Sequence, residues 1–406
     1  PWNSGRRNCK KNRPKYSGSK TCNRIFLSFY NFLRTCFNKY FSKIAFFFLN
    51  FETNQSIFLS MSNLKFKKVK FGTLYDGRKV HLYTVSNGSM SFSAIDYGCT
   101  ITSILLPAKG GKKVDVLLGC STLEGYASSG SCFGTVVGRF ANRIGGAAFS
   151  LNGKTYQLDK NDGENCLHGG FDRYEKKLWS AKKIRTDKGL GIEFSRISPA
   201  GEQNMPGNLK IKVTYTLNED NELTLDYFAK TDAPTPVNLT NHAYFNLKGY
   251  DGGSIEDQEL KMDCSKFVEV DEHLIPSGNL CSVDEKKAFD FRVPKLIGKD
   301  IKETGSGYDH AYCIDSYNGS LVEFAVLKDP ASGRTMTVST TLPACQIYTA
   351  NFIDGVGKNG YPLKSHDAVC METEAYPDAP NHENFPSCIV TPEKLYHETT
   401  VYKFGF

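Results

Sequence analysis

Alternating apolar residues on both sides of a short polar turn constrain the fold of this chain most strongly. Every second residue of 209–217 is apolar, and the alternation resumes over 223–229 after the polar turn at 218–222. A side-chain period of two is typical of a strand with one buried face, and two such runs joined by a turn predict an antiparallel hairpin. The pattern predicts strands that pair with their neighbours in sequence.

The same pattern recurs along the chain. The Asn-Gly pairs at 87–88 and 152–153 each separate two alternating runs, and such a turn is a strong hairpin signal. A Pro/Gly-containing turn at 329–333 separates two further runs. No Pro/Ser-rich linker or internal repeat interrupts residues 61–406, and no Gly-rich nucleotide-binding loop occurs there. The predicted fold class is all-β: one large antiparallel β-sandwich, with 61–406 as a single domain.

Residues 1–60 differ in composition from the rest. They hold eleven Lys/Arg and one acid, Glu52, so they contribute +10 to a net charge of +7 and the other residues sum to −3. A nucleic-acid-binding protein is expected to carry its basic patch on the folded domain, so we predict no nucleic-acid partner. We interpret 1–60 as a non-native upstream segment, disordered or irregular, and Met61 as the natural start.

Two targeting signals are alternatives for this basic segment. Its acid-poor composition also fits a mitochondrial transit peptide. Its apolar run at 44–49 is too short for a membrane anchor, which needs roughly 20 apolar residues. The thirteen cysteines form no C-x-x-C pair and their number is odd, which favours reduced thiols. We therefore predict a cytoplasmic protein without a membrane partner.

Five segments carry side chains suited to proton transfer or to binding a polar ligand. A strand-like run at 237–246 contains an imidazole, a second His precedes a Gly-Gly pair, and a carboxylate follows the apolar run 368–371. Burial at the end of such a run would raise the pKa of the carboxyl and make it a useful base. Each segment alone also has a structural interpretation as a packing residue, a surface side chain or a turn former. The residues concerned are Asn142 and Arg143, His168, His242, Asp309, and Glu372.

Taken together and in this order, the five segments resemble the aldose 1-epimerase family, from about Leu64 to the C-terminus. Further stretches that resemble the family are 95–100, 115–119, 274–278, 289–292 and 346–352. The resemblance implies a galactose mutarotase-like β-sandwich whose cleft binds a free hexose such as D-galactose or D-glucose and interconverts its α and β anomers. It implies no metal and no cofactor.

The same resemblance assigns roles to individual residues. Glu372 matches the general base of the family and His242 its general acid. The matches to groups that contact the sugar are Asn142, Arg143, His168, Asp309 and Gln346. One position departs from the family: where many relatives have Gln, this chain has Glu374, two residues after the expected base. On a strand both carboxyls would share a face, and repulsion between them would raise one pKa.

Three other functions use a similar fold or similar residues. A hexose-6-phosphate 1-epimerase needs additional cationic groups for the phosphate, and no further Arg/Lys cluster matches a motif. A carbohydrate-binding protein would bind sugar without accelerating mutarotation, and a glycoside hydrolase would cleave a bond with two carboxylates, here Glu372 and Asp309. The sequence does not rank galactose against glucose, and monomer and homodimer both remain open.

Overall fold

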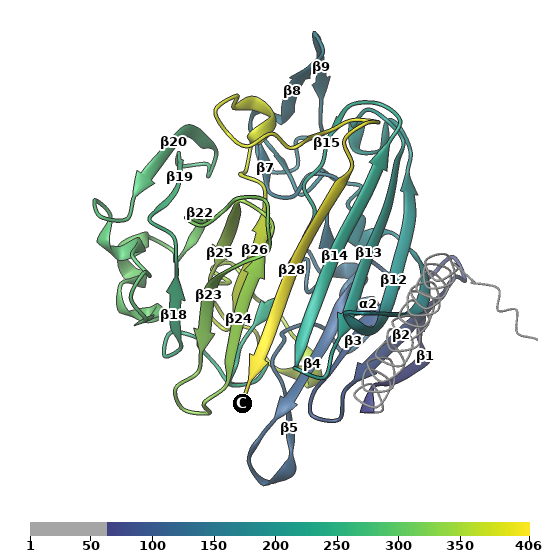
Figure 1. Ribbon diagram of the computed structural model, residues 1–406, viewed down its shortest axis with the longest axis vertical. Coiled ribbons are helices and arrows are strands. Elements are labelled where there is room, and N and C mark those ends of the chain that lie inside the picture. Colours follow the sequence, from purple (N-terminus) through teal and green to yellow (C-terminus); the bar gives the residue numbers. More distant parts are fainter. Residues whose placement is uncertain (1–62) are drawn as a thin grey trace, which may run out of the picture. The chain divides into compact units, whose positions relative to one another are not determined.

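Antiparallel hairpins dominate the part of the chain that the computed structural model describes, residues 63–406 (Figure 1). The four hairpins predicted from alternation and turns are confirmed by the pairing of their strands. These pairs are β13 (Leu209–Leu217) with β14 (Glu222–Thr231), β2 (Lys79–Ser86) with β3 (Ser91–Ile95), β8 (Ala148–Leu151) with β9 (Lys154–Gln157), and β23 (Val322–Lys328) with β24 (Thr335–Thr340). The expected upstream segment 1–60 lies outside the described residues, whereas Asn63–Phe406 form one unit.

Three sheets carry most of the strands. The nine-stranded sheet has the order β11 (Ser180–Thr186), β12 (Gly189–Ser198), β13, β14, β28 (Tyr396–Gly405), β24, β23, β18 (Glu259–Met262) and β21 (Lys295–Leu296). The six-stranded sheet has the order β17 (Tyr244–Phe245), β26 (Val369–Glu374), β25 (Ala344–Tyr348), β22 (Asp309–Cys313), β19 (Lys266–Val270) and β20 (Pro276–Ser282). The five-stranded sheet has the order β1 (Lys65–Thr73), β2, β3, β4 (Ile101–Pro107) and β5 (Lys113–Asp115).

Short elements connect these sheets. The remaining two-stranded pairs are β6 (Val136–Val137) with β16 (Thr240–Asn241), β7 (Arg143–Ile144) with β10 (Cys166–Leu167), and β15 (Thr235–Pro236) with β27 (Ile389–Val390). Within the described residues the α-helix is α2 (Leu123–Ser128). The 3-10 turns are η2 (Lys109–Gly111), η3 (Gly145–Ala147), η4 (Tyr174–Lys176), η5 (Glu202–Asn204), η6 (Lys287–Phe289), η7 (Ile297–Lys299), η8 (Ile301–Thr304), η9 (Lys358–Gly360) and η10 (Ala379–Asn381).

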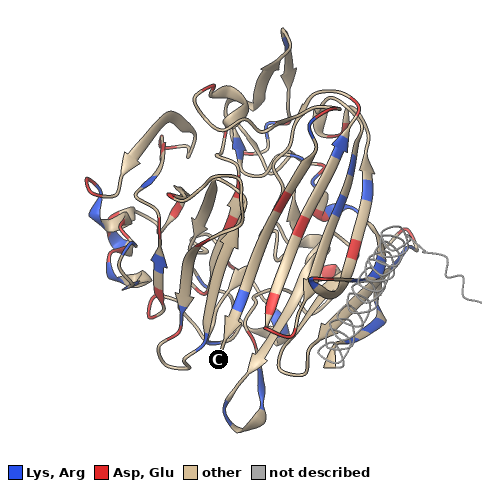
Figure 2. Ribbon diagram, in the orientation of Figure 1, with Lys and Arg blue, Asp and Glu red and all other residues tan. Residues whose placement is uncertain are grey.

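The nine-stranded sheet packs one face against the other two sheets. On its β12–β13 side, Tyr215 meets Phe92 of the five-stranded sheet edge to face, with ring centroids 6.4 Å apart. On its β28 side, the Tyr402 hydroxyl donates to the Met371 carbonyl of β26 at 3.2 Å. Charged residues of both signs lie along the strands of this sheet (Figure 2), and in β13 the exposed Lys210 and Lys212 alternate with buried apolar residues. One buried and one charged face explain the period of two in the sequence, and the predicted all-β sandwich is confirmed.

One expected strand is broken. The run 237–246 does not form a continuous strand; it contains the two-residue strands β16 and β17 with His242 between them. The chain changes partner at this point, because β16 pairs with β6 and β17 pairs with β26. The prediction of a single strand there was wrong, since periodicity does not report a change of pairing partner.

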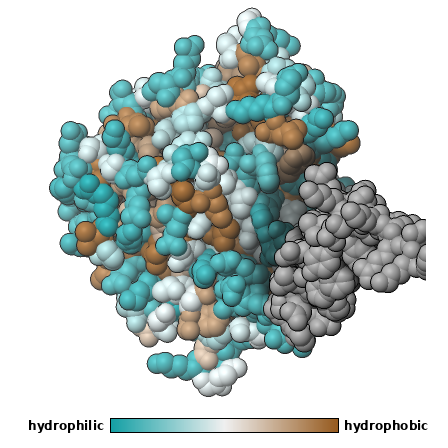
Figure 3. All heavy atoms as spheres, in the orientation of Figure 1, coloured by the Kyte–Doolittle hydropathy of each residue, from teal (hydrophilic) through white to brown (hydrophobic). Residues whose placement is uncertain are grey.

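The surface of the described residues is mixed in polarity. On the face shown in Figure 3, apolar residues lie in separate small groups among polar ones. No helix within residues 63–406 combines the length and the apolar character needed to cross a bilayer. None of the cysteines in this range forms a disulfide.

Candidate active site

Strand register brings three polar side chains of the six-stranded sheet together. Glu372 of β26 lies opposite Gln346 of β25, and Gln346 lies opposite Ala311 of β22. Asp309 comes two residues before Ala311, so its side chain projects from the same face of the sheet. The Gln346 Nε2 donates to Asp309 Oδ1 at 2.6 Å. Glu372, Gln346 and Asp309 therefore share one face at adjacent positions.

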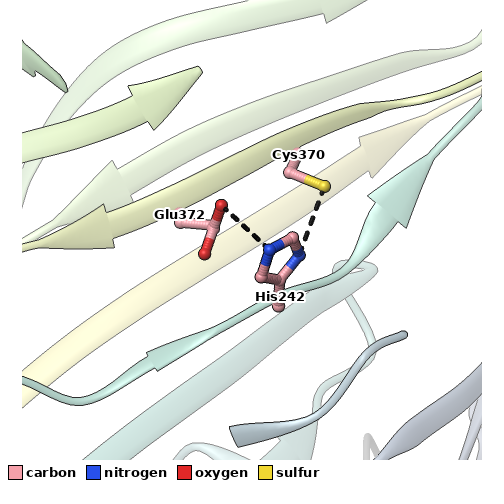
Figure 4. Close-up of side chains that lie close together, drawn as sticks. All are labelled: His242, Cys370 and Glu372. Carbon is pink, nitrogen blue, oxygen red and sulfur yellow. Dashed lines mark hydrogen bonds and ion pairs between the residues drawn. The ribbon is translucent and has the colours of Figure 1, made fainter. Parts of the chain in front are cut away.

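The imidazole of His242 is placed by the break between β16 and β17. Its backbone N–H donates to the Thr135 carbonyl at 2.9 Å, and its carbonyl accepts from the Gly134 N–H at 2.8 Å. Because β17 pairs with β26, the ring lies beside Glu372, with 3.6 Å between His242 Nε2 and Glu372 Oε1 (Figure 4). The expected acid and base thus face each other directly.

The other surroundings of the imidazole restrict its rotation. Its Nδ1 lies 3.5 Å from the Cys370 sulfur, on the side of the ring away from Glu372 (Figure 4). The ring stacks on Tyr244, with centroids 4.9 Å apart and an interplanar angle of 18°. His168 and Tyr348 meet it edge to face. Contacts at both nitrogens and on the ring face hold the imidazole in one orientation.

A second group of site residues comes from the β7–β10 pair. Arg143 lies in β7 opposite Leu167 of β10, and Asn142 and His168 flank these two positions. The Asn142 N–H donates to His168 Nδ1 at 3.1 Å, and the His168 N–H donates to the Asn142 carbonyl at 3.1 Å. Since His168 Nδ1 accepts a hydrogen bond, the proton of the neutral ring lies on Nε2. His168 is therefore a hydrogen-bond donor at its free nitrogen.

All seven residues expected at the site line one cavity of about 320 Å³, together with other residues. The expected residues are Asn142, Arg143, His168, His242, Asp309, Gln346 and Glu372. The structure therefore brings together six separate segments of the sequence. This volume lies at the lower end of the usual range for small-molecule sites, roughly 300–1,000 Å³, and suits a ligand the size of a monosaccharide.

Sequence reasoning missed several residues that line this cavity. Arg173, whose guanidinium pairs with Glu175 at 2.6 Å, occurs in no motif that was singled out. Tyr244 and Tyr348 also line the cavity and belonged to motif segments, but nothing in their spacing separated them from core aromatics. Cys370, which contacts His242 without lining the cavity, was also missed, because it lies within the apolar run before Glu372 and a thiol there resembles any other buried residue.

Burial moves the proton affinities at the site in opposite directions. Loss of water raises the pKa of Glu372 well above its usual value, and the Glu374 carboxyl raises it further. Burial also raises the pKa of Asp309. Burial lowers the pKa of His242 to about 4, and lowers the pKa of His168 well below its ordinary value. Burial therefore favours the neutral form of each group relative to the same group in water.

One cluster contains possible metal ligands. His242, Cys370 and Glu372 are all buried and each offers a ligand atom within 4.8 Å of the others. However, the sulfur contacts Nδ1 and the carboxylate contacts Nε2, on opposite sides of one ring (Figure 4). A single ion binds one nitrogen of an imidazole, so it cannot use both close contacts. The cluster fits an oriented imidazole better than a metal centre.

Comparisons with known proteins identify the family to which the chain belongs. The family model for aldose 1-epimerase matches residues 81–403. The galactose mutarotase of Bos taurus is 41% identical over 329 residues, which cover 80% of this chain and 94% of the bovine protein. The aldose 1-epimerase of Escherichia coli is 33% identical over 338 residues, covering 81% of this chain and 96% of that protein. The crystal structure of galactose 1-epimerase from Lactobacillus acidophilus has a TM-score of 0.74 at 26% identity and covers 84% of this chain and 99% of that one. This chain belongs to the aldose 1-epimerase family.

Proposed function

We propose that this protein is an aldose 1-epimerase that interconverts the α and β anomers of a free hexose such as D-galactose or D-glucose. The observation that carries the proposal is the approach of His242 Nε2 to Glu372 Oε1, 3.6 Å apart at the wall of a cavity rich in polar groups. The curated relatives are named for the same activity. An acid and a base at this spacing can both reach atoms of one small ring.

Opening a hexose ring requires two proton transfers. The C1 hydroxyl must lose its proton, and the ring oxygen must gain one as the C1 to ring-oxygen bond breaks. In our assignment Glu372 takes the first proton and His242 supplies the second. After opening, the C1–C2 bond rotates by about half a turn, and closure on the other face of the aldehyde returns both protons by microscopic reversibility.

The pKa shifts of Glu372 and His242 indicate which of the two holds their shared proton. Burial favours the protonated carboxyl of Glu372 and the neutral imidazole, because it raises the pKa of Glu372 and lowers that of His242. Catalysis in our assignment uses the tautomer with an ionised Glu372 and a protonated His242. Both tautomers contain one proton and have no net charge. Moving between them therefore requires no proton from the solvent.

Rotation about a single bond requires the rest of the sugar to stay in place. His168 offers its Nε2–H, Arg143 a guanidinium, and Asp309 a carboxyl beside the Gln346 amide. We assign these groups, with Asn142, to the hydroxyls of the sugar. Holding the substrate against a fixed acid and base replaces random encounter with buffer groups, which is how such a site gains rate.

A neutral sugar fits the charges of the cavity better than a sugar phosphate. Among the described residues that line it, the cationic side chains are Arg143 and Arg173. Arg143 Nε already donates to Asp162 Oδ2 at 2.9 Å, and Arg173 pairs with Glu175. A phosphate dianion would need cationic groups that are free to pair with it. We therefore favour the free hexose over the 6-phosphate, in the cytoplasm, where free thiols persist.

The proposal is tested by polarimetry on freshly dissolved α-D-galactose, α-D-glucose and their 6-phosphates. We expect faster mutarotation of the free hexoses and little acceleration of the phosphates. Protein with Glu372→Gln, purified in the same way, controls for a contaminating epimerase. Sugar binding without acceleration would indicate a carbohydrate-binding protein, and release of a new reducing sugar from a glycoside would indicate a hydrolase.

A further inference from the structure

A second carboxyl lies next to the catalytic pair without lining the cavity. Glu374 follows Glu372 by two residues in β26, so both side chains project from the same face of the strand. Glu374 is completely buried and does not line the cavity. The proposed reaction uses Glu372 and His242 and assigns no step to Glu374. Ionising a buried carboxyl costs free energy, so a Glu rather than a neutral residue at this position needs a physical explanation.

The hydrogen bonds of Asn142 determine how Glu374 is held. The Asn142 Oδ1 accepts from the Arg143 N–H at 2.8 Å, which orients the amide. Its Nδ2 then donates to Glu374 Oε1 at 2.8 Å. The other oxygen, Oε2, has no hydrogen-bond partner among residues 63–406. Glu374 therefore receives one well-placed donor.

The two carboxyls of β26 differ in how well they tolerate a negative charge. A donated hydrogen bond stabilises the ionised form of Glu374, whereas Glu372 has the imidazole at 3.6 Å as its polar contact within the described residues. Burial raises the pKa of Glu374 to about 8 despite the Asn142 bond. Because Glu374 accepts the Asn142 hydrogen bond, we expect it to lose its proton before Glu372 as the pH rises.

Other ionisable groups face the same carboxyls. Those that can carry a charge near neutral pH are Asp309 of β22, Arg143 of β7, and His242 between β16 and β17. The thiols and phenols are Cys132, Cys345 of β25, Cys370 of β26, Tyr244 of β17, Tyr348 of β25 and Tyr402 of β28. Burial raises the pKa of all six, so they stay neutral at moderately alkaline pH. Asp309 adds to the negative charge near the pair and Arg143 opposes it.

We propose that Glu374 is a positioning residue that keeps the shared proton on Glu372 and His242 at alkaline pH, by like-charge repulsion across one face of β26. Once Glu374 is ionised, removing the proton from the pair would leave two adjacent buried negative charges. The pair therefore keeps its one-proton working state to a higher pH than it would beside a neutral neighbour. A Gln at this position would lack this effect.

The test replaces Glu374 with Gln, a neutral side chain of the same shape whose Oε1 still accepts from Asn142. Glutamate labelled with ¹³C at the side-chain carboxyl is titrated by NMR in wild type and in Glu374→Gln, with Glu372 identified by the resonance lost in Glu372→Gln. We expect the titration midpoint of Glu372 to fall by on the order of one pH unit in Glu374→Gln. The alkaline limb of the pH dependence of kcat/KM should fall with it.

A matched control and a second measurement complete the test. Glu398→Gln changes the same charge at a partly buried Glu that binds Thr341 and does not line the cavity, and it should leave the Glu372 midpoint unchanged. In wild type, the Glu374 resonance should titrate before that of Glu372. An unchanged or higher Glu372 midpoint in Glu374→Gln, or the reverse order in wild type, would overturn the proposal.

The kinetic part of this inference rests on the proposed function, whereas the NMR part does not. A wild-type protein without mutarotase activity, but with the expected shift of the midpoint, would refute the proposed function and support the electrostatic role of Glu374. A wild-type protein with mutarotase activity but without that shift would support the proposed function and refute the electrostatic role of Glu374.

Discussion

Replacing Glu372 by Gln, His242 by Ala, and both together tests whether the two side chains act as one unit. The distance of 3.6 Å between them leaves room for one shared proton and for the substrate oxygens on either side. A positioned general acid or base contributes about 10²–10⁴-fold to a rate. Each single substitution should therefore lower kcat/KM by about that factor, which corresponds to roughly 3–5 kcal/mol of barrier.

The double variant separates a coupled pair from two independent groups. If ring opening needs both transfers together, removing either group disables the same step, so the double variant should be within about tenfold of the worse single variant. Independent contributions would multiply to about 10⁴–10⁸-fold. Gln is close in shape to the protonated carboxyl that burial favours at this position, so Glu372→Gln should unfold at nearly the wild-type temperature.

The assay is polarimetry of freshly dissolved α-D-galactose at low buffer concentration, which limits catalysis by buffer acids and bases. Circular dichroism and thermal unfolding of each variant control for loss of the fold. A near-native rate in either single variant would refute that residue's role. Multiplicative losses in the double variant would refute the shared-proton mechanism while leaving both residues at the site.

Three further expectations follow from burial and backbone geometry. Activity should fall as the pH decreases through about 4, where His242 gains a proton while Glu372 keeps its own, and an acid limb near the ordinary imidazole pKa in a pH–rate profile would contradict this. Gly169→Ala should lower the free energy of unfolding by roughly 2–4 kcal/mol in a denaturant titration, because φ is +86° and a Cβ would lie 2.6 Å from two oxygens. The control Gly153→Ala, where φ is +73° and no atom lies within 4 Å of the Cβ, should lower it by only about 1 kcal/mol. Burial lowers the pKa of His310 from 6.5 to about 4, so between these pH values the native state binds fewer protons than the unfolded state. The free energy of unfolding should therefore fall by up to about 3 kcal/mol as the pH decreases from 6.5 towards 4. In urea unfolding between pH 7 and 4, His310→Gln should show a smaller loss of stability than wild type.

The hairpins could be predicted because strand period and turn chemistry are local. The alternation over 209–229 and the Asn-Gly turns each specify a pair of neighbouring strands, and the observed register follows them. The run around His242 shows the limit of this reasoning. Its residues have strand character, but the point where the chain leaves β6 and joins β26 depends on partners more than 100 residues apart in the sequence.

The residues of the candidate site could be named from motifs, but their state could not. Nothing in the local sequence shows that Arg173 reaches the cavity or that Cys370 touches His242 Nδ1. The tautomer of His168 follows from a hydrogen bond with Asn142, 26 residues away in the sequence. Such contacts arise only when separate strands and loops meet.

Strand periodicity and turns predicted an all-β sandwich, and the ordered motifs predicted the family and suggested which residues act as acid and base. The pKa values of the site residues could not be predicted from the sequence, because they depend on loss of water and on charges brought together from remote segments. The bond from Asn142 to Glu374 spans 232 residues, and it determines which of two neighbouring carboxyls carries a charge more easily. The tertiary structure therefore determines the protonation of residues that sequence motifs alone could name.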